Sequence, residues 1–541
     1  MNKCNAIMNM SSQPGMRHTR QRPQNTGPFP KSMRLKLLLP FLLLVSSAAY
    51  GSPWKTMVAL PASELRSWLS QFPSDQQALI GQPACGVRVA KFEYETVGGE
   101  NELTNASGAL MVPYGPSHRC HGARPIVLYA HGTAIDRAAD LSAITDPKNS
   151  AHRLSQRLAL LFAAQGYIVI APNYAGYDVS RLTYAPYLNE TQQARDMLDG
   201  LAAGRSRLSR IRRWVRDSGK LFVTGYSQGG YVAMATLKAL DAQGRPATAG
   251  APLSGPYALA AAGDEVFLGH PNFGASVYLS MIANSYAHLA QNAIRLEDIF
   301  NPRYADAPRL FPGNVTKDTF RSLVQAGKIP LAAIFQSPPT GYANLDSLHE
   351  GVLNAAWLDP SNYLINSAFR SSYVDDVTAH PDGAAPPDGS KPNFSDVLPT
   401  LPKQPANRLR QDLKLNDLRD YTPSMPLFLC GAHRDPEVFW SQGAAAMTAM
   451  LDSKVGSHPF LRYATLDLDT QEHPVPLASH GLTEYARRTL GKIASATQKA
   501  FVGHQYQTAL DQVITLLSLE GYHSAAEPYC SVAARAFFRL F

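Results

Sequence analysis

The chain has 541 residues, of which 45% are apolar and 17% are charged. This composition is typical of a globular protein and excludes both a disordered chain and a chain that coats nucleic acid with dense charge. The length suffices for one large α/β domain with an insertion, or for two ordinary domains.

Residues 33–52, MRLKLLLPFLLLVSSAAYGS, have the pattern of a secretory signal peptide. Arg34 and Lys36 precede an apolar stretch of about a dozen residues, and small residues form the exit. Pro40 interrupts the apolar stretch, which is shorter than the roughly 20 residues that cross a bilayer. We therefore expect positions 1–52 to be removed on export, leaving a protein with no integral membrane segment.

The positive charge is concentrated in this leader. The chain has a formal net charge of +8, but positions 1–52 hold seven basic residues and no acid, so the remainder carries only +1. A nearly neutral chain has no electrostatic reason to bind nucleic acid. We therefore expect no nucleic-acid partner.

Four cysteines follow the leader, and an even number in an exported protein favours disulfides over free buried thiols. Proximity in sequence favours a bridge between Cys85 and Cys120, which leaves Cys430 to pair with Cys530. The sequence contains no C-x-x-C or H-E-x-x-H motif, and its histidines lack ligand spacing. We therefore expect no metal and no other cofactor.

Two segments rich in β-forming residues, 86–99 and 107–113, predict an antiparallel pair. Short apolar runs then alternate with helical patterns, such as the one over 154–166, and such runs are typical of buried parallel strands. The runs are 125–130, 167–172, 221–226, 248–253, 426–431 and 460–466. This alternation predicts an α/β fold with a mostly parallel sheet and right-handed crossovers.

One connection is far longer than the others. About 170 residues separate Leu253 from Pro426, where a crossover needs only a few dozen. The first half contains apolar helical patterns at 274–294 and 294–300, and the stretch 382–405 is rich in proline. These features predict an inserted cap that ends in a long loop.

This insertion divides the chain into three parts. Residues 1–52 form the N-terminal extension and signal peptide. Residues 53–257 and 421–541 form one α/β domain, and residues 258–420 form the cap. Because parallel strands end at one edge of the sheet, we expect the cap to lie over that edge.

The stretch VTGYSQGGYVA, residues 223–233, places Ser227 between an apolar strand pattern and a helical pattern. Gly225 and Gly229 flank the serine, as a sharp strand-to-helix turn requires. This is the nucleophile elbow, which exposes a serine hydroxyl above the sheet. The N-terminus of the following helix favours the negative charge that develops during acyl transfer. The pattern therefore predicts Ser227 as a nucleophile.

An oxyanion formed at Ser227 needs two preorganised donors. The backbone amide of Gln228 supplies one of them. The second is expected from the loop YAHGTAID, residues 129–136, where we assign the amide of Thr133. His131 precedes the serine in the chain, and we interpret it as a residue that holds this loop.

In this type of site the acid and the base follow the serine in that order. The stretch PLFLCGAHRDPEVF, residues 426–439, places Asp435 just beyond a buried strand, with Glu437 as its competitor. For the base, His480 lies in SHG directly before a helical pattern, whereas His473 lies inside a connecting loop. We therefore predict a triad of Ser227, Asp435 and His480.

The motifs SGALMVP, YAHGT, GYIVIAPNYAGY, GYSQGG and CGAHRDPEV together resemble the bacterial branch of the secretory lipase family, whose members are α/β-hydrolases. The resemblance runs from about residue 80 to residue 490. It implies an exported serine esterase or lipase with a cap over its site. The resemblance is weak across 258–420, so it does not imply which esters are cleaved.

Two other functions share parts of this pattern. A peptidase of the prolyl oligopeptidase type has the same triad, but roughly 40 residues between Gly51 and the first strands leave no space for its propeller. A binding protein on a hydrolase scaffold lacks the serine or the histidine, and this chain has both. We therefore predict a carboxylic ester hydrolase that acts on a small-molecule or lipid ester. The sequence does not define the oligomeric state, and we favour a monomer.

Overall fold

The computed structural model of the chain covers most of the sequence from residue 57 onward. The leader 1–52, His473 and most of the proline-rich stretch 382–405 lie outside the described residues. The structure describes residues 57–211, 214–290, 294–337, 357–381, 404–469, 477–512 and 521–541.

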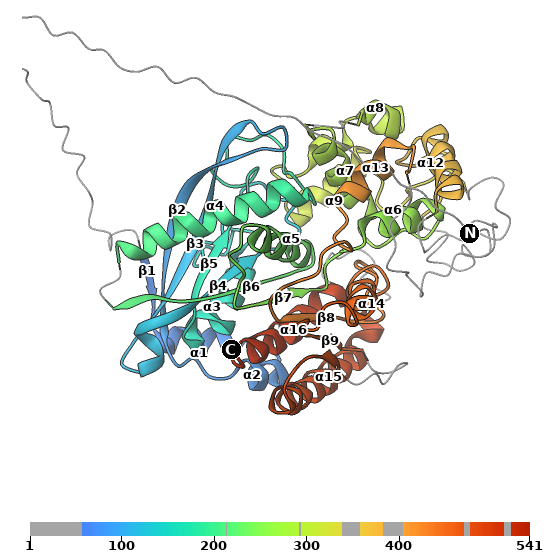
Figure 1. Cartoon of the computed structure of the whole chain (residues 1–541). Helices are drawn as coiled ribbons and strands as arrows, with labels where there is room; N and C mark the ends of the chain where they lie inside the picture. Colours follow the sequence, from blue (N-terminus) through green and yellow to red (C-terminus); the bar gives the residue numbers. More distant parts are fainter. Residues whose placement is uncertain are drawn as a thin grey trace, which may run out of the picture. The chain divides into compact units, whose positions relative to one another are not determined.

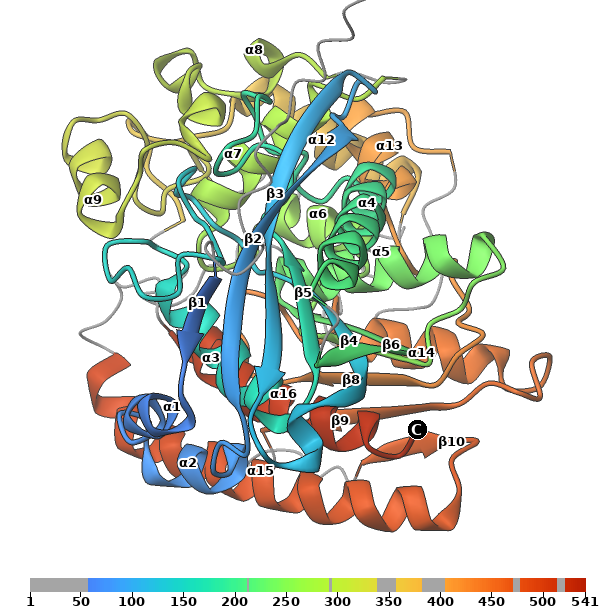
Figure 2. The same ribbon diagram turned by 90° about the vertical axis from the view of Figure 1, so that its left-hand side faces the viewer.

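One ten-stranded sheet runs through the described part of the chain, with the spatial order β1-β2-β3-β5-β4-β6-β7-β8-β9-β10 (Figures 1 and 2). Its order differs from the order in sequence only where β4 and β5 exchange places. The strands are β1 Met57–Leu60, β2 Gly86–Val97, β3 Leu103–Tyr114, β4 Gly122–Ala130, β5 Ile168–Pro172, β6 Val215–Tyr226, β7 Ala249–Leu253, β8 Leu427–Gly431, β9 Tyr463–Asp467 and β10 Ala478–His480.

The central strands from β5 to β9 run parallel, whereas the edge strands β1, β2, β3 and β10 pair antiparallel with their neighbours. All residues of β5, β7 and β8 are buried, which explains why these strands are continuous apolar runs in the sequence. The predicted antiparallel pair and the predicted mostly parallel sheet are both confirmed.

Helices cover both faces of the sheet. Helix α5 packs on β6 and β7 together with α4, and α16 packs on β6, β7 and β8 together with α3. Figure 2 shows α4 and α5 on one side of the strands and α3 and α16 on the other. The helices outside the insertion are α1 Ala62–Leu69, α2 Ser74–Ile80, α3 His152–Leu161, α4 Glu190–Ser209, α5 Gln228–Ala242, α14 Ala444–Lys454, α15 Glu484–Gln512 and α16 Tyr522–Phe538.

The insertion between β7 and β8 is helical in its described parts, as the apolar patterns predicted. These helices gather at one end of the molecule, coloured green to orange in Figure 1. They are α6 Leu259–Leu268, α7 Ala275–Tyr286, α8 Leu296–Ile299, α9 Lys317–Gln325, α12 Ser367–Ala379 and α13 Arg408–Leu415. Gly51–Phe541 forms one compact unit, so the insertion packs closely on the α/β core.

A buried arginine holds three helices of the insertion together. Arg410 of α13 pairs with Asp264 of α6 at 2.6 Å and with Asp376 of α12 at 2.9 Å. Both carboxylates also accept hydrogen bonds from this guanidinium, so the buried charges are compensated. This network fixes α6, whose residues reach the site described below.

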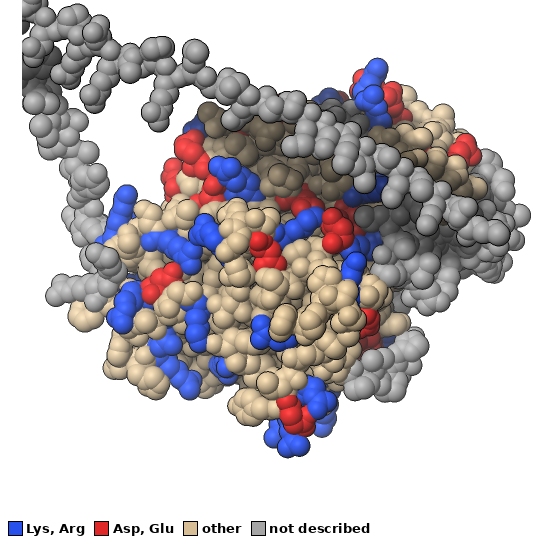
Figure 3. Space-filling model, in the orientation of Figure 1, with Lys and Arg blue, Asp and Glu red and all other residues tan. Residues whose placement is uncertain are grey.

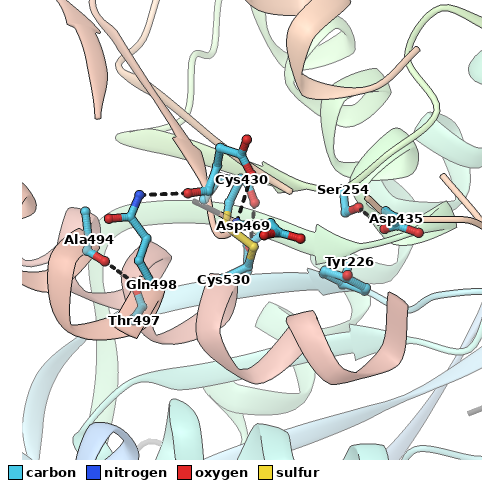
Figure 4. The surroundings of a disulfide bond; sticks show 12 residues. Tyr226, Ser254, Cys430, Asp435, Asp469, Ala494, Thr497, Gln498 and Cys530 are labelled. Atoms are coloured by element: carbon cyan, nitrogen blue, oxygen red, sulfur yellow. Dashed lines mark hydrogen bonds between the residues drawn. A yellow bond between two sulfur atoms is a disulfide. The ribbon is translucent and has the colours of Figure 1, made fainter. Parts of the chain in front are cut away.

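Both predicted disulfides are present, Cys85–Cys120 and Cys430–Cys530, with Cα–Cα distances of 5.5 and 5.7 Å. The second bridge joins β8 to α16 (Figure 4). Because Asp435 follows β8 by a few residues, this bridge ties the start of the acid loop to α16.

Charges of both signs are interspersed on the described part of the face shown in Figure 3. That face therefore presents no field of a single sign. Of the helices that the structure describes, none combines the length and the apolar character needed to span a membrane.

Candidate active site

Ser227 occupies the sharp turn between β6 and α5. Its backbone has φ 62° and ψ −127°, a conformation that L-residues adopt only under constraint. Its amide donates to Leu253 of β7 at 3.0 Å, and its carbonyl accepts from Gly230 at 2.8 Å. A Cβ on Gly229 would collide with the carbonyl oxygen of Ala130 at the end of β4. Glycine there lets β4 approach the turn, which holds Ser227 in its strained position.

The loop after β4 lies directly beside Ser227. A Cβ on Gly132 would come within 3.6 Å of the Ser227 Cβ. The next residue, Thr133, and the residue after the serine, Gln228, both line a cavity together with Ser227. Thr133, from the loop after β4, and Gln228, at the start of α5, were predicted to supply the oxyanion donors, and both lie beside the serine.

His131 supports this loop. Its ring nitrogens lie 2.7 Å from the Gly132 carbonyl oxygen and 3.1 Å from that of Asn173, and its ring stacks on Tyr174. Tyr174 in turn donates to the His131 carbonyl at 3.0 Å. Burial lowers the pKa of His131, while its hydrogen bonds to the two carbonyl groups oppose this shift. These contacts match the structural role expected for His131.

Asp435 is buried on the loop after β8 and is held by several donors. The amides of Glu437 and Val438 donate to its Oδ1 at 3.0 and 3.1 Å, and the Ser254 hydroxyl donates to Oδ2 at 3.1 Å. Figure 4 shows Asp435 beside Ser254 and Tyr226. The same Oδ2 lies 2.5 Å from Nδ1 of His523, so the acid does hold a histidine.

His523, which the sequence analysis did not select, is the second residue of α16 and is 4% exposed. The Tyr226 hydroxyl, next to the serine in sequence, donates to the His523 carbonyl at 2.6 Å. Nε2 of His523 has no hydrogen-bond partner among the described residues, and His523 lines a cavity with Ser227. One ring nitrogen is thus fixed by Asp435, and the other is available to a reacting group.

Nearby carboxylates control the charge of His523. Burial disfavours the imidazolium, but the charge and hydrogen bond of Asp435 and the charges of Glu437 and Glu527 outweigh it, raising the pKa of His523 to about 9. The site therefore stabilises the protonated ring, which is the state that a general base reaches after it has taken a proton.

The structure does not bring His480 to Ser227, so this part of the predicted triad requires correction. His480 lies in β10, at the edge of the sheet, where its ring faces Tyr463 of β9. Strands β7, β8 and β9 separate β10 from β6, which is about 19 Å at the usual strand spacing. After β9 the chain forms β10 and the long helix α15 before α16 returns His523 to the site.

Glu437, the competitor for the acid position, has a different partner. Its carboxylate accepts a hydrogen bond from the hydroxyl of Tyr278 in α7 at 2.8 Å. Burial raises the pKa of Glu437. Because His523 bonds to Asp435, the structure favours Asp435 as the residue that orients the histidine.

Ser227 lies at the junction of two cavities. We call the larger one, about 340 Å³, the outer cavity; the loop after β4, α3 and the start of α16 line it. We call the smaller one, about 80 Å³, the cap cavity. Both are lined by Thr133, Ser227, Tyr278 and Glu437. Apolar insertion residues line the cap cavity, namely Leu259, Ala262, Val266, Phe267, Leu279, Ile282, Leu409 and Leu413.

In the part of the chain that the structure describes, no cluster of three or more His, Cys, Asp or Glu residues could hold a metal ion. The arrangement provides a hydroxyl, a histidine held by a carboxylate, and an apolar cavity at the same point. Such a set can transfer an acyl group through a serine.

The structural comparisons place this architecture in a known class. One similar structure is a ligand-bound form of the rice cell wall degrading esterase LipA from Xanthomonas oryzae, which is 24% identical to this chain. The alignment covers 81% of this chain and 94% of the esterase, with a TM-score of 0.57. A mutant of that esterase is 25% identical; the alignment covers 84% of this chain and 96% of the mutant, with a TM-score of 0.56. A candidate hydrolase from Legionella pneumophila is 20% identical; the alignment covers 73% of this chain and 88% of the hydrolase, with a TM-score of 0.53.

The chain thus has the α/β-hydrolase fold, and the predicted resemblance to esterases of this fold is confirmed by its structural neighbours. No protein-family model and no curated protein sequence matches the chain. Many functions share one fold, so the fold alone does not define the reaction.

Proposed function

We propose that the protein is an exported serine hydrolase of carboxylic esters whose triad is Ser227, Asp435 and His523. The observation that carries this proposal is the free Nε2 of His523 in a cavity that Ser227 also lines, with Nδ1 held by Asp435. The esterase identity of LipA, which shares the fold, supports the same reaction class. The two disulfides and the signal-like leader support export.

In the first half of the reaction, Nε2 of His523 takes the Ser227 proton while the serine oxygen attacks the ester carbonyl. Asp435 keeps the Nδ1–H directed at its Oδ2 and stabilises the imidazolium that forms. The amides of Gln228 and Thr133 stabilise the negative oxygen. His523 then gives its proton to the departing alcohol, which leaves an acyl-Ser227 intermediate.

In the second half, His523 takes a proton from a water molecule, and the resulting hydroxide attacks the acyl carbon. The proton then returns to the Ser227 oxygen as the acid departs. The junction of two cavities suits both halves, because one cavity can hold the acyl group while the other admits the alcohol or the water. The apolar wall of the cap cavity favours it for the acyl chain.

The insertion 258–420 acts as the cap in this proposal, because its side chains form the apolar wall of the cap cavity. The cavity of about 80 Å³ holds roughly three to eight water-sized groups. We therefore assign short and medium acyl chains to it. The direct test is a p-nitrophenyl ester series from acetyl to palmitoyl, in which butanoyl to octanoyl esters should give the highest kcat/KM. A complete lack of hydrolysis across this series would refute the proposed function.

Filling the cap cavity should shorten the preferred acyl chain. Leu279→Trp and Ile282→Trp both add bulk to its wall. We expect each to lower kcat/KM for hexanoyl esters about tenfold or more, because overpacking an apolar site costs more than 1 kcal/mol. Acetyl esters should still be cleaved at near normal rates. Leu331→Trp, at an exposed position of the insertion, is the control and should leave the profile unchanged. An unchanged profile in both cavity variants would place the acyl chain elsewhere.

The rate should rise with pH until His523 is neutral. Only the neutral imidazole accepts the serine proton, and the pKa of His523 is raised to about 9. We expect kcat/KM for p-nitrophenyl butanoate to increase through neutral pH, with its midpoint near pH 9. Glu437→Gln should move this midpoint to lower pH, because it removes one of the charges that favour the imidazolium. A wild-type midpoint near pH 6.5 would show that these carboxylates do not raise the pKa of His523.

A further inference from the structure

One side chain of the cap cavity lacks the partners that its chemistry requires. Gln228, the first residue of α5, is 2% exposed. Neither Oε1 nor Nε2 of its side chain has a hydrogen-bond partner among the described residues. A buried amide without partners is costly, and such groups are rare unless another molecule satisfies them.

Apart from the nucleophile Ser227, the other polar side chains of this cavity are paired. The Thr133 hydroxyl lies 2.8 Å from the Tyr187 hydroxyl, and Tyr278 donates to Glu437. Gln442 pairs with Glu265 of α6. Most of the remaining lining is apolar, so the protein offers little to satisfy the Gln228 amide. Gln228 is therefore distinguished from these paired neighbours by needing a partner from outside the chain.

We propose that the Gln228 side-chain amide binds a hydroxyl or oxo group of the acyl chain, so that the cap cavity selects hydroxyalkanoyl or oxoalkanoyl esters over plain alkanoyl esters. This inference rests on the proposed ester hydrolysis at Ser227. The polar group must lie within the first few carbons of the acyl chain, because Gln228 directly follows the serine that binds the acyl carbon. An amide both donates and accepts, which suits a hydroxyl in either role.

A plain alkyl chain in the cap cavity would leave the amide unpaired in the complex as in the free protein. A hydroxylated chain provides the missing partner, while its remaining carbons contact the apolar wall. Sites that hydrogen-bond a substrate hydroxyl discriminate strongly against the analogue that lacks it. The discrimination here is therefore expected between substrates of nearly equal size, where cavity volume alone predicts none.

The test compares p-nitrophenyl butanoate with p-nitrophenyl 3-hydroxybutanoate. Each kcat/KM is divided by the rate constant for spontaneous hydrolysis of the same ester by hydroxide, so that intrinsic reactivity cancels. We expect wild-type protein to prefer the hydroxy ester about tenfold or more. Gln228→Met, which keeps the length of the side chain but removes the amide, should bring this ratio close to one. Leu331→Met, at an exposed position of the insertion that lines neither cavity, should keep the wild-type ratio.

Thermal unfolding of the same variants provides a second readout. Because the Gln228 amide is unpaired in the free protein, Gln228→Met should leave Tm unchanged or raise it. A lower Tm together with an unchanged ester ratio would show that the amide is structural and would overturn the inference. The wild-type ratio tests the inference even without the variant. Hydrolysis of both esters at equal corrected rates overturns this inference alone, whereas hydrolysis of neither overturns the ester hydrolase as well.

Discussion

Ser227→Ala should abolish ester hydrolysis while the protein stays folded. The substitution removes only the hydroxyl, and alanine places its Cβ in the same strained backbone conformation that serine occupies. Without a nucleophile, His523 has no proton to accept from the protein. We expect kcat for p-nitrophenyl butanoate to fall by on the order of 10⁴-fold or more. Circular dichroism and Tm should match those of the wild type.

Ser206→Ala is the matched control for this experiment. Ser206 lies on the exposed side of α4, and its replacement removes an identical hydroxyl away from the two cavities. We expect no change in kcat from it. Residual activity of Ser227→Ala within about tenfold of the wild type would be incompatible with a serine nucleophile, since the remaining donors alone cannot supply the missing covalent step.

Much of the fold could be predicted from the sequence because its signals are local. Strands such as β5 and β8 are buried on both faces, so each is a short apolar run that ends at a proline or a glycine. The elbow at Ser227 is equally local, since the strand, the glycines and the helix lie within a few residues. Asp435 could be proposed from the sequence for the same reason, because it follows directly on a recognisable strand.

The histidine was missed because its position depends on a long-range return of the chain. His480 has the expected local context, but β10 carries it to the edge of the sheet. One signal in the sequence could have corrected this prediction. The predicted bridge Cys430–Cys530 already placed the segment around residue 530 beside the acid strand. His523 lies seven residues before Cys530, about two helical turns, and therefore on the same face of a helix.

The residues of the cap that line the cavity could not be predicted from the sequence for a different reason. An apolar stripe on a helix looks the same whether it packs into the interior of the insertion or lines a cavity. In the structure both outcomes occur on α7, where Met281 is buried in the core and Leu279 and Ile282 line the cap cavity. Whether a residue of α7 is buried or lines the cavity depends on the space that α6 and α13 leave beside it. That space is set by contacts between helices far apart in the sequence.

His523→Ala should reduce kcat about as much as the loss of the serine does, on the order of 10⁴-fold. Nδ1 of His523 is the ring nitrogen that Asp435 holds, and its Nε2 is free in the outer cavity. His480→Ala, in contrast, should leave kcat and KM unchanged, because β10 lies several strands away from Ser227. Both variants are measured with p-nitrophenyl butanoate at pH 9, where wild-type His523 is half neutral.

The comparison also separates a catalytic loss from a structural one. His523 lies at the start of α16, where the Tyr226 hydroxyl binds its backbone carbonyl rather than its ring, so alanine retains that contact. The helix also stays tied to β8 by the Cys430–Cys530 bridge. His523→Ala should therefore still fold, with a lower Tm because the buried Asp435 carboxylate loses its partner. If His480→Ala were the inactive variant and His523→Ala retained activity, the triad assigned here would be wrong, and the base would have to reach Ser227 from the sheet edge by a rearrangement of β10.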